Sequence, residues 1–118
     1  MAEDLFDRAL ELVMDGGQTL LANGGEVFRV QQTMEIMAAS LGVQDFHVYV
    51  LTNGIFASAH LPGGESVTLV RHVPTVSIHL GRVEAVNELS RELAAGKLGV
   101  VEAEQKLAAA RALPRVTP

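Results

Sequence analysis

The chain has no cysteine, which excludes a disulfide framework, a thiolate metal site and a thiol nucleophile. It has no cluster of Lys and Arg either, and its 118 residues carry a net charge of -5, so nucleic acid is not expected as a partner. No uncharged apolar run reaches the roughly 18 residues of a membrane-spanning helix, and the N-terminus lacks a signal-peptide pattern. We therefore expect a soluble domain in a cytoplasmic setting.

Apolar residues, in contrast, are abundant. They make up 48% of the chain, and the mean hydropathy is +0.25, which is high for a free-standing soluble domain. The length fits one domain with one core. Large exposed apolar patches usually mark interaction sites, so this surplus indicates a partner surface.

Two segments before residue 42 have helical periodicity, over 3–22 and 25–41. An Asn-Gly-Gly sequence at 23–25 separates them, because glycine accepts the left-handed conformation that a helix C-terminus needs. The first segment is apolar on two sides, which is typical of a helix covered on both sides. The glycine pair at 16–17 either allows another element to approach closely, marks a kink, or is a tolerated weak point.

Alternation of side chains predicts strands over 45–52 and 55–61. Asn-Gly at 53–54 is a strong hairpin signal, because both residue types accept positive φ. With these two residues as the turn, Val50 faces Ala57 on the core side. The same register pairs His47 with His60 on the opposite side.

A third strand is predicted over 66–73 with its register left open, and residues 75–79 are either a fourth strand or an extended link. Helices follow over 80–95 and 100–112. Helices and strands are segregated along the chain, which is typical of the α+β class. We expect an antiparallel sheet of three to four strands flanked by two N-terminal and two C-terminal helices.

One face of this sheet would lack a covering element. It would carry Tyr49, Leu51 and Phe56, and the first helix adds two apolar strips. We therefore expect a homo-oligomer, or docking onto a larger partner, through apolar surface.

Four segments carry a resemblance to a known family. They are Leu-Leu-Ala-Asn-Gly-Gly-Glu-Val-Phe-Arg-Val-Gln-Gln-Thr at 20–33, Asn-Gly-Ile-Phe-Ala-Ser at 53–58, Thr-Leu-Val-Arg-His-Val at 68–73, and Val-Asn-Glu-Leu-Ser-Arg-Glu-Leu-Ala-Ala-Gly-Lys-Leu at 86–98. In this order they resemble the threonine/serine exporter family, and in particular the soluble N-terminal domain of its members. The similarity runs from residue 5 to residue 112.

The resemblance implies a cytoplasmic regulatory or assembly domain of an amino-acid exporter. Family members join this domain to a multi-helix membrane domain, in one polypeptide or in two subunits, and split forms are linked to small dicarboxylates such as succinate. Residues 1–113 are then expected to form the domain, and 114–118 a tail or the start of a linker to a membrane domain that this sequence does not contain. The implied location is the cytoplasmic face of the inner (plasma) membrane.

The partners implied are a membrane-spanning exporter domain or subunit, a second copy of the chain, and a small amino acid or dicarboxylate. A small-molecule sensor or a hydrolase-like enzyme is the alternative function. No cofactor and no enzymatic activity are expected.

The family patterns fall on four polar residues, which form the predicted functional cluster: Glu26, Arg29, Arg71 and Asn87. Each has a structural alternative. Glu26 and Arg29 lie on one helical face, where they would form an ion pair or brace the helix hairpin. Arg71 would be a solvated or structural charge, and Asn87, beside an apolar stripe, would make a structural hydrogen bond.

Three positions depart from the family pattern. Asn53 stands where Thr is usual, His79 where Asn is usual, and Gly99 where Ser or Thr would cap the last helix. The first two would alter a polar site. The third should weaken a helix cap by only a few tenths of a kcal/mol.

Metal binding and hydrolysis have little support in the sequence. His47 and His60 would pair without a nearby carboxylate or cysteine, so we expect no metal. Glu26, His72 and Ser90 have the residue types of a hydrolytic triad, but no nucleophile elbow surrounds the serine.

Overall fold

The computed structural model describes residues 2–74 and 77–114, and within them the predicted order of elements is confirmed. The elements are α1 (Ala2–Ala22), α2 (Val27–Ser40), β1 (Gln44–Leu51), β2 (Gly54–His60), β3 (Ser66–His72), α3 (Leu80–Ala94) and α4 (Val100–Arg111). The strands form one antiparallel sheet in the order β1-β2-β3. Of the suggested fourth strand, residues 75 and 76 lie outside the described residues, and 77–79 are not strand.

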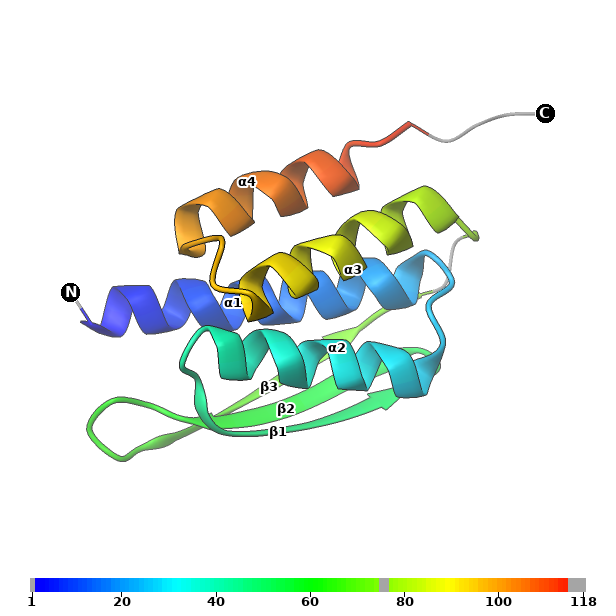
Figure 1. Cartoon of the computed structure of the whole chain (residues 1–118). Coiled ribbons are helices and arrows are strands. Elements are labelled where there is room, and N and C mark those ends of the chain that lie inside the picture. Colours follow the sequence, from blue (N-terminus) through cyan, green and yellow to red (C-terminus); the bar gives the residue numbers. More distant parts are fainter. Residues whose placement is uncertain (1, 75–76, 115–118) are drawn as a thin grey trace.

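The helices form two layers on one side of the sheet (Figure 1). In the layer next to the sheet, α2 packs on β1 and α1 contacts β2. In the outer layer, α3 packs on α1 and α2, and α4 packs on α1 and α3. The expected α+β class, with four helices and a three-stranded antiparallel sheet, is confirmed, and the flanking arrangement is broadly as expected. The main helix contacts of the sheet come from the N-terminal pair, because α1 is apolar on both sides and separates the sheet from the C-terminal helices.

The glycine pair of α1 is a close-approach site. Gly16 and Gly17 are both buried, and they face Met37 and Met34 of α2. A Cβ atom on Gly17 would lie 2.3 Å from Sδ of Met34, and a Cβ on Gly16 would lie 3.1 Å from Cε of Met37. Both methionines are fully buried. Of the three interpretations of the glycine pair, close packing of a second helix is the correct one.

The predicted register of the first hairpin is wrong by two residues. Leu51 pairs with Gly54, so that residues 52 and 53 form the turn, and Val50 pairs with Ile55 instead of Ala57. Gly54 belongs to β2, where a Cβ atom would lie 3.2 Å from the carbonyl oxygen of Arg71. A slip of two residues keeps every side chain on its predicted face, because side chains alternate with a period of two.

The third strand places Val67, Leu69 and Arg71 on the side of the helices. Residues of the opposite face of the sheet are covered by none of the elements that the structure describes. The inner face of the sheet therefore contains one cation, Arg71, near the end of the edge strand β3.

Replacing each of the two glycines by alanine should separate the effect of close packing on stability from the effect of helix propensity. Alanine favours a helix interior over glycine by about 1 kcal/mol. At Gly17 we expect Gly17→Ala to lower the free energy of unfolding by about 1–3 kcal/mol, because the buried Met34 side chain has to shift out of the space that the new methyl group needs.

Gly16→Ala is the matched control, since Met37 has to move by only a few tenths of an ångström. Its free energy of unfolding should stay within about 1 kcal/mol of the wild type. Urea unfolding followed by circular dichroism measures both changes. A Gly17→Ala variant more stable than Gly16→Ala would contradict the close-approach interpretation.

Candidate functional site

Glu26 caps the second helix. It is the N-cap residue of α2, and its carboxylate accepts a hydrogen bond from the backbone nitrogen of Phe28 at 3.2 Å. Arg29 is exposed one turn later and has no ion-pair partner among the described residues. The predicted ion pair between the two residues is therefore absent, because the carboxylate turns back to the free N–H groups of its own helix.

Arg71 binds the first helix. Its guanidinium lies 2.6 Å from Oε2 of Glu11, 2.5 Å from Oδ1 of Asp15 and 2.8 Å from Oε1 of Gln18. These three partners recur along one face of α1, so a single planar cation holds two helical turns. The Arg71 side chain is only 21% exposed, and Arg111 of α4 lies 3.8 Å from the second oxygen of Asp15. The arrangement connects β3, α1 and α4.

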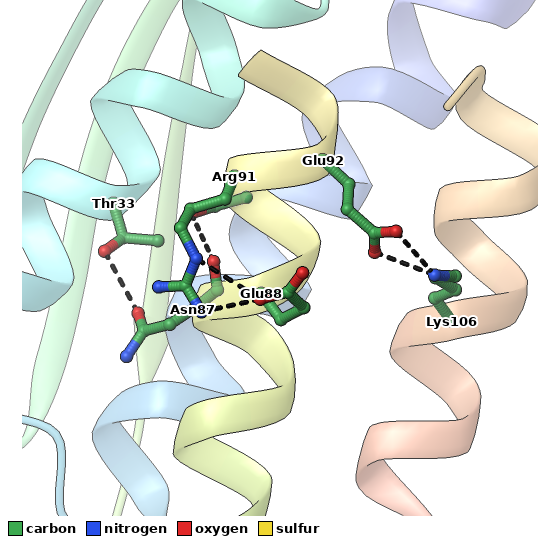
Figure 2. Close-up of polar contacts among 7 residues, drawn as sticks. Thr33, Asn87, Glu88, Arg91, Glu92 and Lys106 are labelled. Atoms are coloured by element: carbon green, nitrogen blue, oxygen red, sulfur yellow. Dashed lines mark hydrogen bonds and ion pairs between the residues drawn. The ribbon is translucent and has the colours of Figure 1, made fainter. Parts of the chain in front are cut away.

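Asn87 lies between two helices. Its side-chain oxygen accepts a hydrogen bond from Oγ1 of the buried Thr33 at 3.5 Å, which joins α3 to α2 (Figure 2). On the other side of α3, Glu92 binds Lys106 of α4 at 2.7 and 2.9 Å. An open depression runs along α3 and is lined by Gly81, Glu84, Ala85, Asn87, Glu88 and Arg91.

The four residues of the predicted cluster thus have separate surroundings. Glu26 bonds to Phe28 in the first turn of α2, Arg71 bonds to α1, and Asn87 bonds to Thr33 farther along α2. Each takes part in a structural contact of its own or, for Arg29, faces solvent. A ligand-binding role for these residues stays a prediction.

A polar junction that the sequence did not reveal joins the start of α3 to two distant segments. His79 is the N-cap of α3: its Nδ1 accepts from the backbone nitrogen of Arg82 at 3.1 Å, and its Nε2 lies 2.9 Å from the carbonyl oxygen of Pro114. Arg82 donates to the carbonyl oxygen of Leu113 at 2.7 Å. The backbone carbonyl oxygen of the buried Asn23 accepts a hydrogen bond from the backbone nitrogen of His79 at 2.9 Å.

This junction explains one departure from the family pattern. An Asn at position 79 would cap α3 in the ordinary way. The larger imidazole caps the helix with one ring nitrogen and reaches the segment after α4 with the other. A second departure, Gly99, is partly compensated, because its backbone nitrogen donates to the Glu102 carboxylate at 3.0 Å.

Three titratable groups meet on the uncovered face of the sheet. Asp45 adopts a φ of 52° at a bulge in β1, and its carboxylate lies 2.9 Å from Nε2 of His47 and 2.6 Å from Nδ1 of His60. The hydrogen bond from His47, followed by the charge interactions of both imidazoles, holds the pKa of Asp45 below its ordinary value. The predicted His47–His60 pair is therefore wrong: His47 is opposite Ser58, and the carboxylate stands between the two rings.

The three residues considered for a hydrolytic triad do not come together in the structure. Glu26 caps α2, His72 is on the uncovered side of β3, and Ser90 is buried in α3, where its hydroxyl donates to the carbonyl oxygen of Asn87 at 2.9 Å. In the ranges 2–74 and 77–114, no group of three or more His, Cys, Asp or Glu side chains is arranged to hold a metal ion.

Comparison with known proteins gives one match. Residues 11–117 match the model of the family described as "Putative threonine/serine exporter", which is nearly the whole chain. The chain belongs to this family. No curated protein and no solved structure matches it. None of the helices in the described part of this exporter-family chain is long and apolar enough to cross a membrane.

Arg71→Met should show how much the exporter-family domain depends on the contact between β3 and α1. We expect the free energy of unfolding to fall by about 2–4 kcal/mol, since Asp15 and Gln18 lose a partly buried donor. The matched control is Arg91→Met, which removes an exposed pair with Glu88 and should cost less than about 1 kcal/mol. Urea unfolding measures both. Equal losses for the two variants would contradict a structural role for Arg71.

Proposed function

We propose that this chain is a cytoplasmic regulatory or assembly domain of a threonine/serine exporter, which docks onto a membrane-spanning domain or subunit and works as a homo-oligomer. Family membership supports the exporter context. The observation that carries the docking proposal is a group of exposed apolar side chains at one end of the helical layers. This apolar end comprises Phe28, Ile78 and Leu80.

The apolar end is built from segments that are distant in the sequence. Phe28 lies in the first turn of α2, 65% exposed, and Ile78 and Leu80 flank the N-cap of α3, 72% and 68% exposed. Ile78 lies against the glycine turn that precedes α2, since a Cβ atom on Gly24 would lie 3.0 Å from Cγ1 of Ile78. Both helices begin at the same end of the molecule (Figure 1).

Exposure of large apolar side chains is costly unless a partner covers them. At this end the polar junction of Asn23, His79 and Arg82 holds the supporting backbone in place. A rigid apolar end of this kind suits docking onto another protein surface, because little ordering of side chains and loops is needed on binding.

The docking proposal predicts an effect of Phe28→Thr on transport. The domain is expressed together with a membrane-spanning exporter chain of the same family, and threonine and serine efflux from preloaded cells is measured. We expect Phe28→Thr to weaken co-purification of the two chains about tenfold and to reduce efflux, because an exposed anchor is lost without loss of folding. Val101→Thr, at an exposed apolar position of α4, is the control. Wild-type co-purification and efflux for Phe28→Thr would contradict docking through this end.

A small-molecule sensor is the second candidate, and the depression along α3 favours it. Arg91 offers a guanidinium for a carboxylate, Glu84 and Glu88 offer carboxylates for an ammonium group, and Asn87 offers an amide for a hydroxyl. These are the groups of a free hydroxy amino acid such as threonine or serine. The exposed Arg91–Glu88 pair would open at little cost when such a ligand binds.

Titration of the chain with threonine, serine and succinate, followed by NMR chemical shifts, tests the sensor. A sensor predicts saturable shifts on α3 that Arg91→Gln abolishes and that Arg111→Gln, on α4, leaves unchanged. No shift with any of the three compounds at millimolar concentration would exclude the sensor and leave the docking role as it stands.

A further inference from the structure

The uncovered face of the sheet has an apolar row across all three strands. Tyr49 of β1 pairs with Phe56 of β2, and Phe56 pairs with Val70 of β3. These side chains are 73%, 44% and 61% exposed. Leu51 adds a fourth exposed apolar side chain next to Tyr49 on the same strand face. The row and Leu51 together are called the sheet patch.

Around the sheet patch, this face is nearly free of charge. Its other outward positions in the three strands are Gln44, His47, Gly54, Ser58, His60, Ser66, Thr68 and His72, with Asp45 at the bulge. None of these described positions is Lys, Arg or Glu. The carboxylate of Asp45 is the one permanent charge among them, and two imidazoles contact it.

This composition selects among binding partners. A surface for anionic lipid or nucleic acid needs clustered Lys and Arg, and this face has neither. An oppositely charged protein surface would find almost no charge to pair with. A surface of the same composition, however, is complementary to it, since neutral apolar side chains meet neutral apolar side chains and no like charges are brought together.

We propose that a second copy of this chain packs on the sheet patch, face to face, with Phe56 at the two-fold axis. The proposal deepens the homo-oligomeric part of the proposed function by naming its contact surface. With the axis along the central strand, Phe56 of one copy faces Phe56 of the other, and Tyr49 faces Val70. Each copy offers the same patch, as a closed two-fold interface requires.

The size of the face fits a dimer of moderate affinity. Strands of seven or eight residues are about 25 Å long, and three strands with their side chains are about 15 Å wide. Two such faces bury on the order of 1,000 Å² in total, which is at the lower limit of specific interfaces. A dissociation constant in the micromolar range is therefore expected.

Sedimentation equilibrium of the 118-residue chain, from about 1 μM to about 500 μM, tests the proposal. We expect a monomer–dimer equilibrium for the wild type, and for Phe56→Thr a dissociation constant at least about tenfold higher. Phe28→Thr makes the same substitution at the apolar end and should leave the equilibrium unchanged. Val70→Thr is nearly isosteric, keeps the strand propensity, and should weaken the dimer even if Phe56→Thr does not fold.

The outcomes separate this inference from the docking role. A wild-type monomer at 500 μM, or a dimer that Phe28→Thr weakens and Phe56→Thr and Val70→Thr do not, overturns the sheet dimer. Docking on the membrane-spanning chain fails separately, through loss of co-purification in the transport experiment. If Phe56→Thr and Val70→Thr abolish co-purification without any dimer in the wild type, the patch belongs to the membrane-spanning partner and the proposal is wrong.

Discussion

The packing of α2 against the glycine pair of α1 is the contact on which the rest of the fold depends. Met34 and Met37 fill the space that the missing Cβ atoms of Gly16 and Gly17 leave open. Val86 of α3 approaches the same point, since it would lie 3.9 Å from a Cβ atom on Gly16. Three helices thus meet where the side chains of one are absent. The flexible methionine side chain suits such an irregular space better than a branched one.

Polar contacts join the helices and strands at the edges of the apolar core. Arg71 connects the edge strand to α1, and His79 and Arg82 connect the start of α3 to the glycine turn and to the segment after α4. No buried side-chain nitrogen or oxygen in the described residues lacks a hydrogen-bond partner. The buried Asn23, with its amide bound to the carbonyl oxygen of Thr19 at 2.7 Å, illustrates why this matters, because an unpaired amide there would cost several kcal/mol.

The fold places charged and apolar side chains on different parts of the surface. The Arg8–Glu104 ion pair joins the two helical layers, and the Arg8 hydrogen bond lowers the pKa of Glu104. The Glu92–Lys106 ion pair joins α3 and α4 within the outer layer. The sheet contributes a neutral face, and the glycine turn contributes an apolar end. The chain therefore has two distinct groups of exposed apolar side chains, one on the sheet and one at the glycine turn, apart from its charged helical side.

The sequence by itself determined the elements and their inward faces, because helical and strand periodicity are local properties of neighbouring residues. It also determined that Glu26 would lie at a helix start and that glycine would end α1. The sequence did not determine the roles of the candidate residues. The partners of Arg71 on α1 are between 53 and 60 residues away, and the carboxylate beside His47 was two residues away but on a bulge that alternation does not predict.

Only the tertiary structure decided the hairpin register, the layer order and the meaning of the glycine pair. A slip of two residues along β2 preserves the alternation, so the pattern fits Ala57 and Ile55 equally well as the partner of Val50. Likewise, the sequence around a helical glycine does not show whether the glycine is a weak point of the helix or a place where another helix packs closely. The difference lies in what packs against it, and Met34 comes from a helix whose position depends on the whole core.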